Sequence, residues 1–467
     1  MLSCKSWIPF AGTFLKNCRS IYKSCYLTHN SEPEDLIPSD QEYNRIVNHY
    51  FHLKESHNCL IIQPYVKWGP KKLTITPEEQ LSEAIALVET LPGWAVKETL
   101  SVPLDTLERK TLFKSGSMEK IRQLVQKSND VTAIFINSGV LNKGTVIILQ
   151  DNFHRPILDR YKIVMQILKT NARSKHAKLQ VALAELYYIQ RKSEKDLMFK
   201  TYNKEALKLM FQDREKKIKY QIAALRKQRT LLRSKRQKMD YPVVAVVGYT
   251  NAGKTAIIKS LTGEERLLPK NQLFATLDVT THQGVLPSGL SVLYIDTVGF
   301  ISDIPTNLIE CFVATLEDAL LADVVLHVED VSSKSYNYKR NHVLTVLEQL
   351  EKGAEAGNIT SKLISVGNKC DLIDSSEIKD HNTLLVSAHK GIGLEDLKQQ
   401  LEDFILYITG RQKLTIRIPN GGDEIRWLYK NATILEEIPD QEDFQFIFAK
   451  VIITQASLQK FKHYFIK

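Results

Sequence analysis

The sequence predicts an α/β protein of several domains, and three observations support this fold class. The chain has 467 residues, which is too long for one compact core. Apolar runs typical of strands alternate with helical patterns both before residue 150 and after residue 243. Between these two parts, residues 157–241 contain neither glycine nor proline, which is typical of long helices. We therefore expect α/β domains on either side of a helical element.

A small, largely parallel α/β domain is predicted over residues 45–156. The segment CLIIQPYV (residues 59–66) has the composition of a buried strand. The segment TPEE (residues 76–79) forms a capping box with proline at the first helical position, so a helix is expected from Thr76 to about Glu89. The other elements expected here are strands over residues 94–102, 131–137 and 145–150 and a helix over residues 118–127.

The segment without glycine is predicted to form a long antiparallel helical hairpin over residues 157–240, with a turn near residues 201–203. Apolar residues recur along it at helical spacing, so two apolar stripes can pack together. The first stripe is Leu179, Ala182, Leu183 and Leu186, and the second is Leu207, Phe211, Ile218, Ile222, Leu225 and Leu232.

The hairpin also carries the net charge of the chain. Residues 200–240 contain 14 basic and 4 acidic residues, a net charge of +10, which equals that of the full sequence. Such a surface is either a solvated coiled-coil face or a binding surface for a polyanion. The acidic residues are too few to neutralise the charge, so we favour contact with the phosphates of structured RNA. Aromatic residues do not alternate with these charges, so recognition of bases is not expected.

Composition argues against several classes of protein. No apolar run approaches the roughly 20 residues that cross a bilayer, so no membrane span is expected. The six cysteines are scattered without a C-x-x-C pair, which argues against a disulfide framework and against a zinc site. The first 31 residues are basic, contain no acidic residue and resemble a mitochondrial transit peptide, with a disordered tail as the alternative. We expect a transit peptide and disordered leader over residues 1–40.

A phosphate-binding loop is predicted at GYTNAGKT (residues 248–255), which matches the pattern G-x-x-x-x-G-K-[ST]. The loop follows an apolar, strand-like run and precedes the helical segment AIIKSLTG. Its glycines let backbone N–H groups converge on phosphate oxygens, and the N-terminus of the helix adds a favourable dipole. Lys254 is expected to reach the β- and γ-phosphates, and Thr255 is expected to bind Mg²⁺.

The base is predicted from NKCD (residues 368–371), which follows another strand-like run. Asp371 can accept two hydrogen bonds from guanine, whereas adenine offers no such pair of donors. Asn368 is expected to tie this loop to the phosphate loop, and the stem of Lys369 is expected to cover the base. The segment SAH (residues 387–389) would offer a backbone N–H to the guanine carbonyl. Together the two motifs predict a GTP site.

Two further segments are predicted to respond to the γ-phosphate. In DTVGF (residues 296–300), Asp296 would hold the Mg²⁺ shell and the N–H of Gly299 would contact the γ-phosphate. In FATLD (residues 274–278), the Thr276 hydroxyl would complete the metal shell only in the triphosphate state, so the loop would order when GTP binds. The alternative is that Thr276 only caps a turn.

Phe300 stands where many nucleotide switches carry a glutamine that orients the attacking water. A phenyl ring cannot orient water by hydrogen bonding, so we expect slow hydrolysis that a partner stimulates. Asn251, in the phosphate loop, is a candidate ligand for a monovalent cation such as K⁺. The predicted catalytic residues are Lys254, Thr276 and Gly299, and the predicted metal ligands are Thr255 and Thr276.

The nucleotide site is thus predicted from five separate segments of the chain. Its candidate residues are Gly248, Tyr249, Thr250, Asn251, Ala252, Gly253, Lys254, Thr255, Phe274, Ala275, Thr276, Leu277, Asp278, Asp296, Thr297, Val298, Gly299, Asn368, Lys369, Asp371, Ser387, Ala388 and His389.

Four segments together resemble those of the HflX-type GTPases: GYTNAGKT, LFATLDVTTH, DTVGFISDIP and NKCD. Upstream, ILDRYKIVMQIL (residues 157–168) and KLQVALAEL (residues 178–186) look like the junction between that family's α/β domain and its helical hairpin. The resemblance covers about residues 45–410. With its basic N-terminus and the segment RWLYKNAT (residues 426–433), the chain most resembles the mitochondrial members.

The resemblance implies a P-loop GTPase domain of the TRAFAC class over residues 241–410. It is preceded by the small α/β domain and the antiparallel hairpin, and a small α+β domain follows over residues 411–467. The family also implies binding to the large ribosomal subunit and its rRNA, with roles in ribosome splitting, recycling and late large-subunit assembly. We expect a monomer. For the mitochondrial members, the place of action is the mitochondrial matrix.

One departure from the family lies at the hairpin tip. The family commonly carries a glycine-rich loop there, but residues 197–208 read LMFKTYNKEALK, which predicts a stiffer tip. A different function class is also compatible with the sequence, namely an RNA-binding assembly scaffold in which GTP hydrolysis is incidental.

Overall fold

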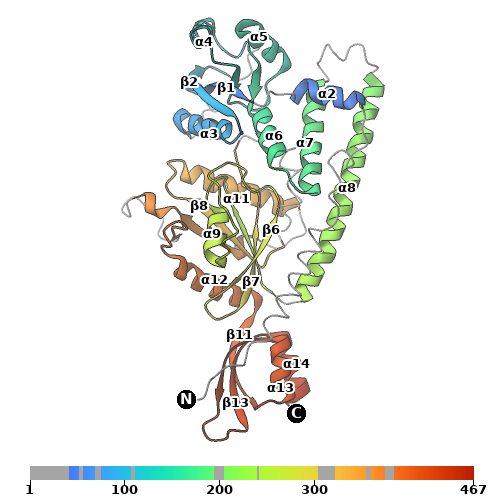
Figure 1. Ribbon diagram of the computed structural model, residues 1–467, viewed down its shortest axis with the longest axis vertical. Helices are drawn as coiled ribbons and strands as arrows, with labels where there is room; N and C mark the ends of the chain where they lie inside the picture. Colours follow the sequence, from blue (N-terminus) through green and yellow to red (C-terminus); the bar gives the residue numbers. More distant parts are fainter. Residues whose placement is uncertain are drawn as a thin grey trace, which may run out of the picture. The chain divides into compact units, whose positions relative to one another are not determined.

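The computed structural model of the chain describes residues 41–51, 56–68, 75–106, 111–193, 204–238, 241–302, 321–353, 359–373 and 383–466 (Figure 1). The chain divides into two compact units, residues 1–49 and 50–467. Helix α2 (Gln41–Phe51) crosses their boundary, and all other described elements belong to the second unit. The leader predicted over residues 1–40 and the hairpin tip at residues 194–203 lie outside the described residues.

The first sheet is fully parallel, as predicted for this part of the chain. Its strands are β1 (His57–Val66), β2 (Trp94–Leu104), β3 (Ala133–Ile136) and β4 (Ile157–Asp159), in the order β2-β1-β3-β4. The helices between them are α3 (Pro77–Glu89), α4 (Ser115–Lys127) and α5 (Lys143–Phe153). Apolar residues of the central strands are completely buried, which explains their continuous apolar composition.

Helix α3 begins where its sequence predicts. The Thr76 hydroxyl accepts a hydrogen bond from the Glu79 N–H at 3.3 Å, and the Glu79 carboxylate accepts one from the Thr76 N–H at 3.2 Å. Two N–H groups that the helix cannot satisfy internally therefore find partners, and such a cap contributes about 1 kcal/mol.

Residues 145–150 do not form the strand that their β-branched run predicts. They belong to helix α5, and the buried residues of that helix are Thr145, Leu149 and Phe153, at a spacing of four. This spacing places the three residues on one helical face, which packs into the core of the first sheet. The fourth strand is β4, within the segment that we expected to be entirely helical.

Three helices follow the first sheet: α6 (Arg160–Asn171), α7 (Lys175–Ser193) and α8 (Lys204–Lys238). Helices α7 and α8 pack side by side as a hairpin (Figure 1). The hairpin therefore begins at Lys175 and not at residue 157 as predicted, because residues 157–171 form β4 and the separate helix α6. Phe211, Ile218 and Ile222 of α8 are buried, which confirms the predicted stripe for the part of α8 whose side chains are described. Leu179, Leu183 and Leu186 of α7 are buried as well.

The second sheet has six strands in the order β10-β9-β8-β5-β7-β6, and all neighbours are parallel except β6 and β7. The strands are β5 (Val243–Gly248), β6 (Thr280–Val285), β7 (Ser291–Asp296), β8 (Val324–Asp330), β9 (Leu363–Asn368) and β10 (Leu384–Leu385). The described helices beside them are α9 (Lys254–Thr262), α11 (Tyr336–Gly353) and α12 (Leu394–Thr409), with short 3₁₀ turns at Thr360–Lys362 and Cys370–Leu372.

The carboxyl ends of the parallel strands bring the sequence motifs together. Strand β5 ends at Gly248, β7 at Asp296 and β9 at Asn368, and each of these residues begins or belongs to a predicted nucleotide segment. Loops that follow adjacent parallel strands meet at one edge of the sheet, where open α/β sheets bind ligands. The fold therefore explains why motifs that are far apart in the sequence form one site.

The third sheet is antiparallel and lies at the C-terminal end of the chain. It consists of β11 (Arg411–Pro419), β12 (Thr433–Pro439) and β13 (Phe446–Thr454), in the order β11-β13-β12. Helices α13 (Asp423–Asn431) and α14 (Gln455–Phe465) cover one of its faces (Figure 1). In the described part of the chain, no helix combines the length and hydropathy needed to cross a bilayer.

Candidate functional site

The phosphate loop connects strand β5 to helix α9 and has no room for side chains at two of its glycines. A Cβ at Gly248 would lie 2.2 Å from the Val328 carbonyl oxygen on the neighbouring strand. A Cβ at Gly253, where φ is +94°, would lie 2.2 Å from the Asn368 side-chain nitrogen. Larger residues at either position would displace the backbone that surrounds the phosphates.

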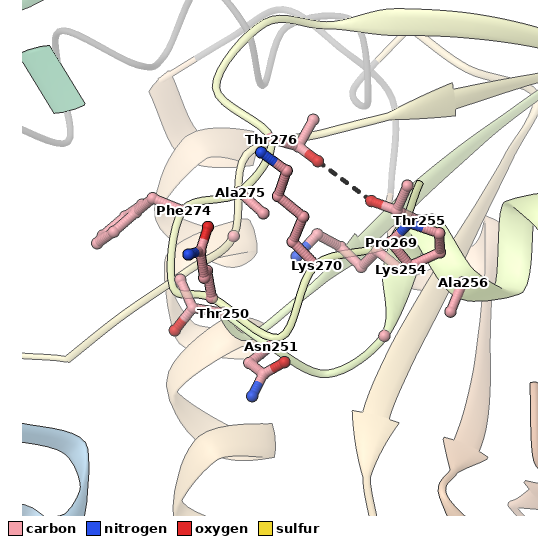
Figure 2. A pocket seen from close by; sticks show the side chains of 13 residues that line it. Thr250, Asn251, Lys254, Thr255, Ala256, Pro269, Lys270, Phe274, Ala275 and Thr276 are labelled. Atoms are coloured by element: carbon pink, nitrogen blue, oxygen red, sulfur yellow. Dashed lines mark hydrogen bonds between the residues drawn. The ribbon is translucent and has the colours of Figure 1, made fainter. Parts of the chain in front are cut away.

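A pocket lies over this loop and is closed on its other side by the FATLD segment (Figure 2). Nine of its lining residues are among the predicted ones: Thr250, Asn251, Gly253, Lys254, Thr255, Phe274, Ala275, Thr276 and Gly299. Four lining residues were not predicted: Ala256, Pro269, Lys270 and Gln272. Pro269, Lys270 and Gln272 could have been predicted, because the basic Lys270 stands close to FATLD in the sequence.

Lys254 places a buried ammonium group at the base of the pocket. Its Nζ donates hydrogen bonds to the carbonyl oxygens of Gly248 at 3.4 Å and Tyr249 at 3.2 Å. Burial lowers the pKa of Lys254 to about 8, although the negative charge of Asp296 opposes this effect. A polyphosphate in the pocket would supply negative charge that stabilises the charged form of this ammonium group.

Three oxygen-bearing side chains meet beside Lys254. The hydroxyls of Thr255 and Thr276 both donate to Asp296 Oδ2, at 2.6 Å and 3.1 Å, and lie 3.1 Å from each other (Figure 2). Burial raises the pKa of Asp296, and its Oδ1 atom is buried without a hydrogen-bond partner. Hard oxygen ligands of this kind fit Mg²⁺, which keeps several waters and takes few protein ligands.

The FATLD segment is attached to the helices that precede the second sheet. Asn171, at the end of α6, donates from its side chain to the Phe274 carbonyl oxygen at 2.9 Å. The Asp278 carboxylate accepts hydrogen bonds from the Ser174 N–H at 3.0 Å and from the Ser174 hydroxyl. Asp278, predicted to contact nucleotide, therefore uses its side chain to hold the segment to the start of α7 instead.

Several other predicted residues also turn their side chains away from the pocket. The Thr297 hydroxyl donates to the Val246 carbonyl oxygen at 2.7 Å, and Leu277 and Val298 are buried. Contributions of these residues to the site are therefore limited to their backbone groups.

Asn368 connects the NKCD segment to two other loops. The contact with the phosphate loop was predicted, and the contact with the SAH segment was not. Its side-chain NH₂ donates to the Ala252 carbonyl oxygen at 2.9 Å, and its side-chain oxygen accepts from the Ala388 N–H at 3.1 Å. The ammonium group of Lys369 forms an ion pair with Asp330 at 2.6 Å, which orients its stem. A hydrogen bond from Ser387 lowers the pKa of Asp371 and keeps it ionised at neutral pH.

Phe300 fastens the DTVGF segment to the phosphate loop through its backbone. Its N–H donates to the Gly248 carbonyl oxygen at 3.1 Å, and its carbonyl oxygen accepts from the Thr250 N–H at 2.6 Å. The phenyl ring is 8% exposed. It is therefore packed within the protein and offers no polar group to a water molecule in the pocket.

The comparisons with known proteins agree with this geometry. Residues 243–369 match the family described as "50S ribosome-binding GTPase", and residues 78–168 match "GTP-binding GTPase N-terminal". "Putative GTP-binding protein 6" of Xenopus laevis is 38% identical over 432 residues, which cover 89% of this chain and 81% of the frog protein. The human protein of the same name is 39% identical, with 87% and 81% covered. "GTPase HflX" of Caldanaerobacter subterraneus is 34% identical, with 70% and 77% covered.

This chain belongs to the HflX family of GTPases. The resemblance inferred from the sequence motifs is therefore confirmed, and so is the prediction that the protein hydrolyses GTP.

A hydrogen-bond network in this HflX GTPase links the phosphate loop to the first sheet and was not predicted. The Tyr249 hydroxyl contacts the Glu83 carboxylate at 2.8 Å and the Ser302 hydroxyl at 3.0 Å, and accepts from the Ser302 N–H at 2.8 Å. Arg160 forms an ion pair with Glu83 and donates to the Ser302 carbonyl oxygen at 3.1 Å. Arg160 also donates to Asn137 at 2.8 Å, at the carboxyl end of β3.

We name Glu83, Arg160, Tyr249 and Ser302 the interdomain network. Three of its members, Arg160, Tyr249 and Ser302, stand inside segments that carry the resemblance to HflX: ILDRYKIVMQIL, GYTNAGKT and DTVGFISDIP. Their positions in those segments were the one feature of the sequence that could have indicated a role for these residues. The pairing itself could not be read from the sequence, because it depends on tertiary packing.

Proposed function

We propose that this HflX-family GTPase binds the large ribosomal subunit and acts in ribosome splitting, recycling and late large-subunit assembly. The observation that carries the proposal is the attachment of both γ-phosphate-responsive segments to the helical part of the protein. FATLD is held by Asn171 and Ser174. Ser302, two residues after DTVGF, is held by Arg160. A change in these segments on hydrolysis would therefore reach helices α6 and α7, and the basic helix α8 packs on α7.

The charged surface of α8 supports RNA as the partner. Lys204, Lys208, Lys216 and Lys227 are exposed along its described side chains. Acidic partners are few: Asp213 pairs with Lys217 at 2.7 Å, and Glu215 pairs with Lys219 at 2.6 Å. Excess positive charge on one helix favours binding of a phosphate backbone, with an affinity that falls as salt rises.

The pocket supports GTP with Mg²⁺ as the bound species. Thr255 and Thr276 would be the metal ligands, and Asp296 would hold the shell; Mg²⁺ would supply charge neutralisation for the phosphates. Lys254 would contact the β- and γ-phosphates, and the Gly299 N–H would contact the γ-phosphate. Asp371 would accept from guanine, with the SAH segment offering a backbone N–H to the guanine carbonyl.

A monovalent cation beside the phosphates would complete the site through Asn251. This residue has a positive φ of +61° and lines the pocket, and its side-chain NH₂ donates to Asn271 at 2.7 Å. Its side-chain oxygen would then be the ligand for K⁺. Equal turnover in K⁺ and Na⁺ at matched ionic strength would contradict this role.

Hydrolysis would be slow without a partner, because Phe300 cannot orient the attacking water. The ribosomal particle would supply the missing stabilisation, so that turnover is coupled to binding. We place this activity in the mitochondrial matrix because the first 31 residues resemble a transit peptide. A monomer satisfies all the contacts of the site described above.

The test compares GTP turnover with and without mitochondrial large subunits at matched salt. We expect strong stimulation by the large subunit and none by the small subunit. Lys254→Ala should abolish turnover in both conditions, which controls for contaminating GTPases. Absence of stimulation would favour the alternative of an RNA-binding scaffold, and competition by ATP as effective as that by GTP would contradict the guanine site.

A further inference from the structure

One face of the third sheet is only partly covered by the rest of the protein. Residues of β13 alternate between its two faces: Ile447, Ala449, Val451 and Ile453 pack under α13 and α14. The opposite face carries Phe446, Phe448, Lys450 and Ile452 of β13, with Arg417 and its neighbours of β11 beside them.

The two ends of this second face differ. At one end, Ile452 is buried in the core of the second sheet, and Lys413 forms an ion pair with Glu402 of α12. At the other end, Phe446 and Phe448 are only half-buried, and Phe444, just before β13, is 79% exposed. Aromatic rings are therefore presented at the end that the second sheet leaves uncovered.

Cations border these rings on both sides. The Arg417 guanidinium lies 4.3 Å from the centre of the Phe446 ring, and Arg417 stands opposite Phe448 across the strands. Lys450 follows on β13 and is about half exposed. We name Arg417, Phe446, Phe448 and Lys450 the aromatic patch. Both cations are paired with carboxylates, Arg417 with Asp440 at 2.7 Å and Lys450 with Glu436 at 2.7 Å, and Glu442 and Asp443 stand in the turn just before Phe444.

We propose that the aromatic patch binds single-stranded nucleic acid by stacking bases on Phe446 and Phe448. A nucleic-acid strand offers what the patch combines: flat base faces for the rings and phosphates for the adjacent cations. A purely apolar protein partner would offer nothing to the guanidinium and ammonium groups. The alternation of aromatic and cationic groups is the feature that helix α8 lacks, so the two surfaces recognise different forms of nucleic acid.

The topology of the sheet is suited to this use. The element order β11-α13-β12-β13-α14 is that of a split β-α-β-β-α-β unit without its last strand. RNA-recognition motifs place base-stacking aromatic residues on the open face of a sheet, opposite the helices. Here the two rings lie on the central strand, and Arg417 of the adjacent strand supplies a third planar group for stacking.

The test uses the full chain and an eight-nucleotide fluorescein-labelled strand, as RNA and as DNA of the same sequence. Phe446→Leu combined with Phe448→Leu keeps apolar bulk but removes both rings, and we expect binding to weaken roughly tenfold or more. Binding of an RNA duplex should not change. Phe446→Tyr combined with Phe448→Tyr keeps the rings and should keep the affinity.

The matched control removes two aromatic rings from the helical side of the same sheet. Tyr429 and Tyr464 are 64% and 66% exposed on α13 and α14, and their replacement by leucine should leave single-strand binding unchanged. GTP turnover by every variant reports whether the nucleotide site is intact, since the patch lies outside the nucleotide pocket.

Stacking has its own signature, which needs no variant. A strand containing 2-aminopurine should lose fluorescence when it binds the unmodified protein, because stacking on a ring quenches the base. No quenching, equal affinity of the leucine and original proteins, or equal loss in the Tyr429 and Tyr464 control would each overturn the proposal. Binding of RNA alone or of RNA and DNA alike would both support it. None of these outcomes depends on stimulation by ribosomal subunits.

Discussion

The ionised state of Asp371 makes this residue the most direct test of base recognition. Asp371→Asn replaces one acceptor by an NH₂ donor, which the guanine 2-amino group cannot accept. We expect GTP affinity to fall roughly 100-fold or more, and xanthosine triphosphate, which has a carbonyl at that position, to bind in its place. Titration calorimetry with both nucleotides measures the change.

The control for this variant is another aspartate-to-asparagine exchange. Asp403 is exposed on helix α12, and Asp403→Asn should leave both affinities unchanged. If the Asp371→Asn variant still prefers GTP, the carboxylate of Asp371 does not recognise the base.

The low pKa of Lys254 gives nucleotide binding a pH dependence. Without nucleotide, Lys254 has a pKa of about 8, whereas the phosphates of a bound nucleotide favour its charged form and raise that pKa. Affinity should therefore be nearly constant below about pH 7 and decrease above about pH 8, because binding must then take up a proton. Between about pH 7.0 and about pH 8.8 we expect a loss of roughly sixfold.

Fluorescence titration with a labelled GDP analogue over this range measures the effect. Lys254→Met removes the titrating group, so its weaker binding should be independent of pH over the same range. A parallel decline in the two proteins would assign the dependence to another group.

Single residues divide into those that the sequence reveals and those that only packing reveals. Lys254, Asn368 and Asp371 stand in short motifs, because the chemistry of phosphate and guanine demands certain residue types at fixed spacing. Glu83 and Ser302 have no such local constraint. Their partner Arg160 is 77 residues from Glu83 and 142 residues from Ser302, so only the folded chain brings them together.

At the scale of elements, the sequence predicts where a short apolar element lies better than whether it is a helix or a strand. The run at residues 145–150 is β-branched, and this favours a strand until the burial of Thr145, Leu149 and Phe153 is known. Tertiary packing decides between the helical and the strand periodicity, because α5 packs on the sheet and β4 forms its edge strand. Longer patterns, such as the stripe along α8, are predicted correctly because they repeat over many turns.

Helix α8 should lose its affinity for the ribosome when its charge is reversed. Lys208, Lys216 and Lys227 are exposed and lie within about 100° of one another around the helix. Replacing all three by glutamate should abolish co-sedimentation with the large subunit at physiological salt, since each lost phosphate contact lowers both affinity and salt dependence. GTP affinity should not change, because the helix does not line the pocket.

A matched triple variant controls for net charge. Lys430, Lys460 and Lys462 are exposed on α13 and α14, and their replacement by glutamate gives the same charge change elsewhere. This protein should still sediment with the large subunit. Equal loss of binding in the two variants would show that net charge rather than α8 determines association.

At the scale of the whole molecule, the two segments that we expect to respond to the γ-phosphate are tied to different ends of helix α6. FATLD contacts the α6–α7 connection, and Ser302 contacts Arg160 at the start of α6 and Tyr249 in the phosphate loop. Helix α6 therefore contacts FATLD at its end and Ser302, just after DTVGF, at its start. A rigid helix held in this way can transmit a change in either segment to the hairpin that packs against it.

Glu83→Gln should weaken this coupling without entering the nucleotide pocket. The neutral amide removes the carboxylate charge that is paired with Arg160, whose side chain is 4% exposed, and the protein should lose about 1–3 kcal/mol of stability. The unmodified protein should bind the large subunit more tightly with GTP than with GDP. In the variant we expect this ratio to fall about tenfold, while GTP turnover without the subunit stays unchanged.

Linkage makes this prediction testable from both directions. If GTP strengthens binding of the large subunit by some factor, the subunit must strengthen binding of GTP, relative to GDP, by the same factor, and Glu83→Gln must reduce both factors equally. Glu89→Gln, an exposed glutamate on the same helix α3, should change neither. If the subunit distinguishes GTP from GDP as well with the variant as with the original protein, the interdomain network does not carry the signal. The coupling would then have to run through Asn171, Ser174 and the FATLD segment alone.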